Sequence, residues 1–147
     1  QGTNSILAQL YKGRFPFLVG GKHRMSMVFL DDVVDGMVRV LERAPVGRDY
    51  LLAGEVTTLA ALAAKIEALG GAKAPRLDLP VGLARAAAAL VSPLFRLVGR
   101  RPPFTPSQLG SLTREWAFDD TRARTELGWT PRGLDEGLPP TLALFSG

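Results

Sequence analysis

The stretch from residue 25 to residue 53 constrains the fold more than any other part of the sequence. It begins with a largely apolar run, MSMVFL at 25–30, which is typical of a buried strand. Apolar residues three and four positions apart then continue as far as Ala44, where a proline and a glycine end the helical pattern. A second apolar run, YLLA, occupies 50–53. Strand, helix and strand in this order predict a βαβ crossover in a parallel sheet, and hence an α/β fold.

Further helices are predicted at 5–11 and 59–69, where the apolar spacing repeats, and at 121–127, between a capping aspartate and Gly128. A last helix is predicted from Leu134, although Pro139 and Pro140 would interrupt or delay it. Thr57 or Thr58 is placed to cap the second of these helices, and either Asp119 or Asp120 is placed to cap the third. Gly128 follows the third helix, where a left-handed C-terminal cap is expected. Short strands are predicted at 15–19 and 76–79.

The composition excludes several classes of site. The chain has no cysteine, so disulfides and thiolate chemistry are excluded, and a reducing cytoplasm is the expected location. The single histidine, His23, excludes the usual zinc clusters. The net charge is +4, but the arginines are spread along the chain instead of forming one basic block, so no nucleic-acid partner is expected.

Motifs for cofactor binding and catalysis are missing. The sequence contains no Gly-x-Gly-x-x-Gly, no Gly-x-x-x-x-Gly-Lys and no Tyr-x-x-x-Lys. His23 has no nucleophile or orienting carboxylate near it in sequence, so it is interpreted as a loop residue. Asp31 and Asp32 could form a carboxylate pair, but their place at a helix start favours capping, and the same holds for Asp119 and Asp120.

Residues 81–98 form the most apolar stretch of the chain. The stretch is shorter than a membrane span and contains Pro93 and two arginines, so a span is rejected. Its apolar residues cover most sides of a predicted helix, which indicates a face that the chain does not bury by itself. We expect this segment to promote self-association, so a homo-oligomer is one possible assembly and docking to a membrane surface is an alternative.

Three segments in order carry a resemblance to a known family. MVFLDDVVDGMVRVLER, GRDYLLAGEVTTLAALAAKI and WAFDDTRARTELGWTPRGLDEGL resemble the C-terminal part of the NAD(P)-dependent epimerases/dehydratases, the extended short-chain dehydrogenases/reductases. Within the family, the pattern is similar to dihydroflavonol-reductase-like and sugar-epimerase-like members. The resemblance implies the last elements of a Rossmann-like doubly wound fold plus a small, mainly helical substrate-binding lobe. It also implies that Trp116 and Phe118 belong to the core of that lobe.

The resemblance implies one fragment, 1–147, of a longer enzyme. Residues 1–56 would hold a substrate loop and the last Rossmann elements, and 57–147 the substrate-binding lobe. In the family, the Gly-rich loop and the Tyr-x-x-x-Lys pair lie in the N-terminal half, which would bind NAD or NADP and complete the site. The implied function is the substrate-binding part of an NAD(P)-dependent oxidoreductase or epimerase acting on a hydroxyl or carbonyl of a small molecule. The alternatives are a non-catalytic relative that serves as a binding or assembly subunit, or a membrane-surface protein docking through 81–98.

Candidate substrate residues follow from the same resemblance. The family strand often reads Arg-Asp-Phe-Val-His-Val-Asp-Asp-Val, and residues 25–33 occupy these places. Met25 replaces the arginine that grips a sugar-nucleotide diphosphate in many epimerases, and Phe29 replaces the histidine. These differences favour a less charged substrate. The resemblance implies substrate-binding roles for Asn4, Ser5, Arg24, Met27, Phe29 and Arg114.

Overall fold

The computed structural model describes residues 3–84, 86, 89 and 115–145. Its helices and strands are, in chain order, α1 (Thr3–Tyr11), β1 (Leu18–Val19), β2 (Arg24–Met27), α2 (Leu30–Arg43), β3 (Glu55–Thr58), α3 (Leu59–Ala68), β4 (Asp78–Leu79), α6 (Thr121–Leu127) and α7 (Leu134–Ala143). This mixture of helices with small sheets confirms the predicted α/β class. The apolar segment 81–98 lies mostly outside the described residues.

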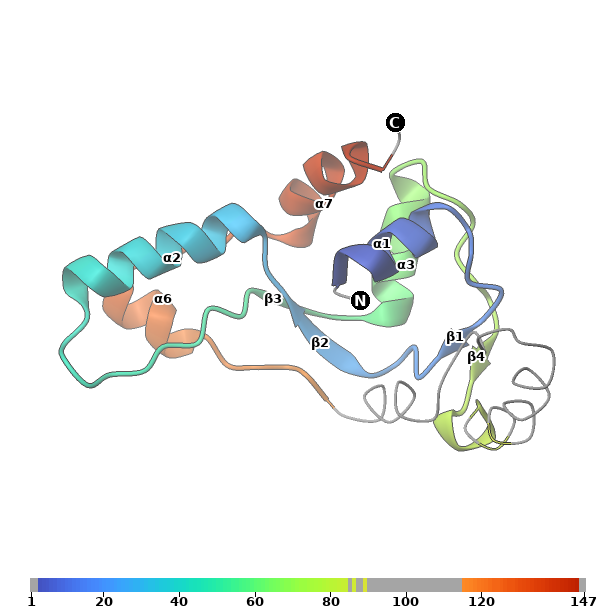
Figure 1. The fold of residues 1–147 in the computed structure, drawn as a ribbon, viewed down its shortest axis with the longest axis horizontal. Helices are drawn as coiled ribbons and strands as arrows, with labels where there is room; N and C mark the ends of the chain where they lie inside the picture. Colours follow the sequence, from blue (N-terminus) through green and yellow to red (C-terminus); the bar gives the residue numbers. More distant parts are fainter. Residues whose placement is uncertain (1–2, 85, 87–88, 90–114, 146–147) are drawn as a thin grey trace, which may run out of the picture.

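Two small sheets connect the helices. β1 pairs in parallel with β4, and β2 pairs antiparallel with β3. Figure 1 shows α1, α3 and α7 grouped on one side of the β2–β3 pair, with α2 and α6 at one end of the molecule and β1 with β4 towards the other. Residue 116 forms a parallel bridge to Met25, which brings the segment before α6 alongside β2.

The βαβ crossover predicted for residues 25–53 is wrong. The second strand of that prediction, 50–53, is not assigned as a strand, and β2 pairs antiparallel with the following residues, 55–58. Gly54, with a φ of +73°, separates the two stretches. No strand lies beside 50–53 in the described part of the chain, so these residues remain an extended segment without a ladder.

The largest core cluster unites three helices that are distant in sequence. It contains buried residues of α1, β1, α3 and α7. Leu62 and Ile66 of α3 lie at its centre with 1% and 0% exposure. Ile66 also packs closely against Gly71, because a Cβ added at Gly71 would lie 2.6 Å from the Cγ2 of Ile66. Burial on this side of α3 therefore fixes the positions of α1 and α7, which form two walls of the cleft described below.

A second cluster joins α2 to α6 through Trp129. Trp129, Ala123 and Leu127 are fully buried, and Leu52 packs against them. The Nε1 of Trp129 donates a 2.7 Å hydrogen bond to the Asp32 carbonyl. Trp116 and Phe118, the aromatic residues expected in the core, are 45% and 46% exposed, so that expectation is wrong. They lie in a segment that is bridged to β2 at Met25, and Trp129 supplies the buried ring instead.

The helix caps in the structure agree in part with those predicted from the sequence. The Thr58 hydroxyl accepts from the Ala61 amide, and Gly128 adopts the left-handed C-cap with φ 65°. α7 begins at Leu134 and continues through both prolines, so the expected interruption does not occur. Capping by Asp31 or Asp32 is wrong, because the N-cap of α2 is Phe29 and the Asp32 carboxylate binds Arg132 instead.

Asp119, not Asp120, supplies the capping carboxylate of α6. Asp120 is the N-cap residue by position but makes no side-chain cap bond, whereas Asp119 Oδ1 accepts from the Thr121 amide at 2.9 Å. The Asp120 carboxylate instead accepts from the Gly54 amide and from Arg124. The hydrogen bonds from the Thr121 side chain and then from its backbone amide lower the pKa of Asp119 below its usual value.

Replacing Asp119 by alanine is expected to lower the free energy of unfolding at neutral pH but not in strong acid. Because the pKa of Asp119 is lower in the folded state, its stabilisation is present above the unfolded pKa and is lost as the pH falls through the folded pKa. Urea unfolding of both proteins across this range measures the effect. Asp119→Asn is the control, since asparagine retains the acceptor oxygen without the charge. An equal loss for Asp119→Ala at both ends of the range would contradict the prediction.

Candidate functional site

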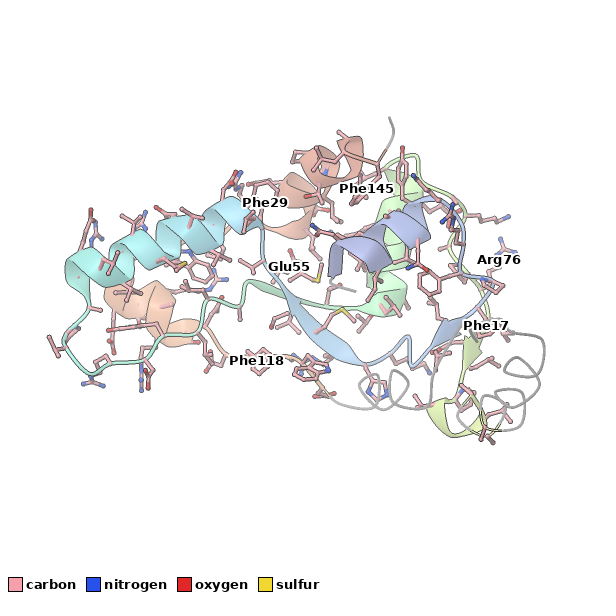
Figure 2. All side chains as sticks on the ribbon, viewed as in Figure 1. Phe17, Phe29, Glu55, Arg76, Phe118 and Phe145 are labelled. Atoms are coloured by element: carbon pink, nitrogen blue, oxygen red, sulfur yellow. The ribbon has the colours of Figure 1, made fainter. Side chains whose placement is uncertain are left out.

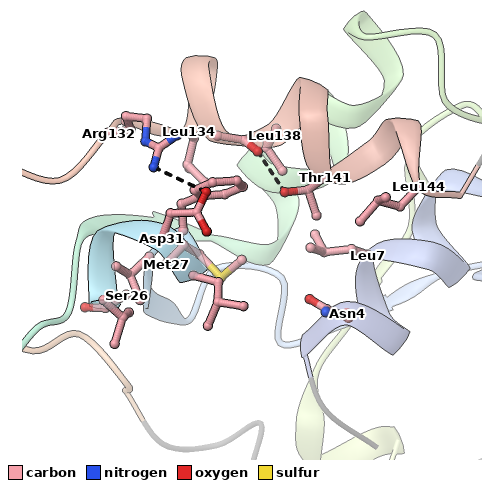
Figure 3. A pocket seen from close by; sticks show the side chains of 16 residues that line it. Asn4, Leu7, Ser26, Met27, Asp31, Arg132, Leu134, Leu138, Thr141 and Leu144 are labelled. Atoms are coloured by element: carbon pink, nitrogen blue, oxygen red, sulfur yellow. Dashed lines mark hydrogen bonds and ion pairs between the residues drawn. The ribbon is translucent and has the colours of Figure 1, made fainter. Parts of the chain in front are cut away.

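A cleft of about 550 Å³ lies between α1, the junction of β2 with α2, and α7 (Figure 3). Most of its lining is apolar, and its third wall, at residues 132–144, follows the other two, at 4–7 and 26–33, by about a hundred residues or more in sequence. The lining residues are Asn4 and Leu7 of α1; Ser26, Met27, Val28, Phe29, Leu30, Asp31 and Val33 around the β2–α2 junction; and Arg132, Gly133, Leu134, Gly137, Leu138, Thr141 and Leu144.

The polar groups of the cleft differ in how far they are already engaged. The Ser26 hydroxyl accepts from the Phe118 amide at 3.0 Å, and the Thr141 hydroxyl donates to the Gly137 carbonyl at 2.8 Å. The exposed Asn4 side chain has no hydrogen-bond partner among the described residues. An amide both donates and accepts. Asn4 is therefore the polar side chain best placed to bind a hydroxyl or carbonyl in this cleft.

Arg132 closes one side of the cleft through a dense set of contacts. Its amide and Nε donate to the Asp32 carboxylate at 2.9 and 2.8 Å, and its Nη2 lies 2.7 Å from Asp32 Oδ1 and 3.8 Å from Asp31 Oδ2. The guanidinium carbon lies 4.3 Å from the centre of the Phe29 ring. The hydrogen bond to Asp32 raises the pKa of Arg132 above its ordinary value, so the guanidinium stays charged.

This ion-pair cluster limits what the cleft can bind. Two carboxylates face the one guanidinium, so the positive charge of Arg132 is already compensated. The described lining contains no other cation, because its remaining members are neutral apart from Asp31. A diphosphate would meet no free positive charge here, whereas a hydrophobic ligand with a few hydroxyl or carbonyl groups would fit the apolar lining.

The structure brings together three of the six candidate substrate residues. Asn4, Met27 and Phe29 all line the cleft. Ser5 lies in α1, and its side chain is outside what the structure describes. Arg24 begins β2 opposite Thr58, is exposed, and is not part of the lining.

The last candidate, Arg114, cannot be compared with the cleft, and several lining residues were not predicted. Arg114 falls outside the described residues. The cleft also contains residues that the sequence analysis did not select, chiefly Arg132 and the α7 residues Leu138 and Thr141. The sequence did contain a signal for Arg132. It is a basic residue just before a helix, and the adjacent Asp31 and Asp32 have no basic partner near them in sequence. No local pattern marks Thr141.

Negative findings narrow the chemistry of the described chain. Among residues 3–84 and 115–145, no group of three or more histidine, aspartate or glutamate side chains is arranged to hold a metal ion. In the same part of the chain, the helices are too short or too polar to cross a membrane.

Comparison with known proteins places these features in context. No protein-family model matches the sequence. The chain is 33% identical over 130 residues to the 4-hydroxy-2-methyl-3-oxo-4-farnesyl-3,4-dihydroquinoline-1-oxide ketoreductase of Stigmatella aurantiaca, which covers 83% of the chain. It is 31% identical over 149 residues to the UDP-glucose 4-epimerase of Mycolicibacterium smegmatis, which covers 98% of the chain. It is 30% identical over 135 residues to sterol demethylase protein B of Methylococcus capsulatus, which covers 90%.

A solved structure is also similar to this chain. The crystal structure described as gox2253 superposes on 99% of the chain with a TM-score of 0.74 at 26% identity, and the match covers 44% of that protein. The match covers 39%, 39% and 40% of the three curated relatives, so the chain spans well under half of their length. The fold is consistent with the C-terminal part of a Rossmann-like protein, and the similarities support a family of epimerases and reductases related to the short-chain dehydrogenases.

Proposed function

We propose that this chain is the substrate-binding part of an NAD(P)-dependent oxidoreductase or epimerase, and that its substrate is a largely apolar small molecule with a hydroxyl or carbonyl group. The observation that carries the proposal is the apolar cleft, in which Asn4 offers a free amide and Arg132, the only cation of the described lining, is compensated by two carboxylates. Relatives that include a ketoreductase and an epimerase support the reaction class.

The relatives differ in the kind of substrate that their names indicate, and the chemistry of the cleft favours one kind. The names of two of them refer to a farnesyl-bearing quinoline and to a sterol, both largely hydrocarbon, while the name of the third refers to a nucleotide sugar. Met25 stands where epimerases carry a diphosphate-binding arginine, and Arg132 is engaged by Asp31 and Asp32. Both features favour a hydrophobic substrate over a nucleotide sugar.

The residues present do not fit NAD(P) itself. The sequence contains no Gly-rich pyrophosphate loop and no Tyr-x-x-x-Lys pair. No chemical step is therefore assigned to these residues. Their role in the proposal is to bind the substrate, to exclude water through the apolar lining, and to orient one polar group of the substrate through the Asn4 amide.

Calorimetric titration of the 147-residue chain tests the proposal. Farnesol, an apolar isoprenoid alcohol, is expected to bind, while NADH, NADPH and UDP-glucose are expected to show no binding at the same concentrations. The physical reason is that an apolar cleft gains free energy by covering hydrocarbon surface but offers no uncompensated charge to a phosphate. Binding of UDP-glucose without binding of farnesol would overturn the apolar-substrate proposal.

Matched variants on α1 locate the binding site. Asn4→Ala is expected to weaken farnesol binding about fivefold, the effect of losing one hydrogen bond. Lys12→Ala is the control, because Lys12 is exposed just after the other end of α1 and is not part of the cleft lining. Equal effects of both changes, or no effect of Asn4→Ala, would show that the ligand binds elsewhere.

A further inference from the structure

Two segments that are distant in sequence run side by side, one from α1 to β1 and the other from α3 to β4. At one end, the Ala72 amide donates a 2.9 Å hydrogen bond to the Tyr11 carbonyl. At the other end, Leu18 pairs in parallel with Asp78. Both segments therefore run in the same direction along the part of the molecule that holds β1 and β4 (Figure 1).

The two segments carry four exposed cations, Lys12 and Arg14 on the first and Lys73 and Arg76 on the second. In the part of the chain that the structure describes, none of these four side chains forms an ion pair. In Figure 2, Arg76 lies at the outer edge of the molecule. Basic residues that are scattered in the sequence are thus gathered by the fold into one basic surface, defined by these four residues.

The carboxylates within and next to these segments do not neutralise the basic surface. Glu67 Oε2 accepts from the Ala74 amide at 2.9 Å, and Asp78 Oδ1 accepts from the Gly21 amide at 2.9 Å. Both carboxylates are thus held by backbone amides, and they number two against four cations. The surface keeps an excess of positive charge, which attracts an anionic partner.

Exposed apolar side chains lie among the cations. Leu77, which follows Arg76, is 57% exposed, and Leu69, which ends α3, is 44% exposed. Cations beside exposed leucines suit the surface of a lipid bilayer, where the charges reach the phosphates and the hydrocarbon enters the acyl boundary. A purely polar anion would use the charges but would leave the leucines in water.

Helix α1 connects the basic surface with the cleft. Asn4 lines the cleft near the start of α1, and Lys12 follows the end of the same helix. A rise of 1.5 Å per residue separates the two residues by about 12 Å along the helix axis. A chain that rests on lipid through the basic surface would therefore hold the cleft within about one length of α1 from the bilayer.

We infer that the basic surface docks the chain on anionic lipid headgroups. The choice of lipid among anionic partners rests on the proposed function, because a largely apolar substrate partitions from water into a bilayer. A lysine or arginine near an anionic membrane raises the partition coefficient about fivefold. Four such residues on one surface are therefore enough to hold the chain at the membrane without a spanning helix.

Co-sedimentation with lipid vesicles tests the inference on the 147-residue chain. The double variant Lys73→Gln/Arg76→Gln is expected to bind vesicles of equal parts phosphatidylcholine and phosphatidylglycerol about twentyfold more weakly than the unchanged chain. Arg48→Gln/Arg122→Gln is the matched control, because it removes the same charge from exposed residues at the α2–α6 end of the molecule. Its binding is expected to fall less than about threefold, since charges beyond a Debye length of the bilayer are screened.

Lipid composition and salt provide measurements that need no substitution. The unchanged chain is expected to bind vesicles of phosphatidylcholine alone only weakly, and added sodium chloride is expected to release it from the anionic vesicles. Equal binding to neutral and anionic vesicles would overturn the inference, because the apolar segment 81–98 would then make the contact. Equal losses in the two double variants would also overturn it, because net charge alone would then determine binding.

Soluble anions test the choice of lipid. Titration with glycerol phosphate and with a single-stranded oligonucleotide is expected to show binding much weaker than that to the anionic vesicles. If either binds as tightly as the vesicles, and Lys73→Gln/Arg76→Gln abolishes that binding, the basic surface serves a soluble phosphate or a nucleic acid. Either result would overturn the inference of a lipid partner.

Titration with farnesol in the absence of lipid separates this inference from the proposed function. If farnesol binds in solution while Lys73→Gln/Arg76→Gln keeps its full affinity for anionic vesicles, the lipid-docking surface is wrong and the apolar-substrate proposal stands. If the double variant loses vesicle binding but farnesol does not bind, the lipid-docking surface stands and the apolar-substrate proposal is wrong.

Discussion

Replacement of Gly54 by alanine is expected to lower the free energy of unfolding by roughly 3 kcal/mol or more. Gly54 has a φ of +73°, and a Cβ added there would lie 2.2 Å from the carbonyl oxygen of Met27 and 3.0 Å from Val28 Cα. The free-energy cost of the left-handed backbone and the cost of the steric clash add to each other. Because the obstructing atoms belong to the backbone, no side-chain rotation can relieve the overlap.

Gly47→Ala is the matched control for this prediction. Gly47 has a φ of +82°, but nothing lies within 4 Å of an added Cβ. Alanine there is expected to cost only the left-handed strain, about 1 kcal/mol. Chemical denaturation of both variants measures the difference. Equal destabilisation would show that backbone conformation alone, and not the close approach to β2, determines the requirement for glycine at residue 54.

The contact at Gly54 also connects stability to the candidate site. Met27 and Val28 line the cleft, and they are the residues against which Gly54 packs. Gly54 is also where the extended segment 50–53 ends and β3 begins. A side chain at residue 54 therefore has to displace either the extended segment 50–53 or the wall of the cleft.

Local pattern was sufficient to predict most of the helices. The three-and-four spacing of apolar residues located α1, α2 and α3, while α6 was located by the aspartates before it and by Gly128, which adopts the expected left-handed C-cap. The spacing could not identify strand partners. Residues 50–53 are apolar enough for a strand, but a strand requires a neighbour, and the described chain offers none.

The candidate site was less predictable, because it depends on contacts between distant segments. Asn4, Phe29 and Arg132 meet in one cleft although about 130 residues separate the first from the last. The resemblance to a known family indicated the first two. Asp32 was interpreted as a helix cap because its sequence neighbours cannot show that Arg132 approaches it. Aspartate at a helix start therefore had two roles open to it, and tertiary contact selected between them.

Replacement of Trp129 by alanine is expected to destabilise the chain by about 4 kcal/mol. Trp129 is fully buried between α2 and α6, and its Nε1 bonds the Asp32 carbonyl. Its removal leaves a cavity beside Gly36 and Leu52, which both contact the indole or its neighbours. The loss would also loosen the position of Asp32, which holds Arg132 at the cleft.

The second tryptophan provides the control for this prediction. Trp116→Ala is expected to cost below about 1 kcal/mol, because the ring is 45% exposed and the backbone bonds of residue 116 to Arg24 and Ser26 remain. Denaturant unfolding followed by circular dichroism measures both variants. In the Trp116→Phe protein, the remaining indole is expected to emit at short wavelength and to resist quenching by iodide, since Trp129 has 0% exposure. A larger loss for Trp116→Ala than for Trp129→Ala would mean that the aromatic pair before α6 forms part of the core after all, and that the junction of α2 with α6 contributes little to the stability of the cleft.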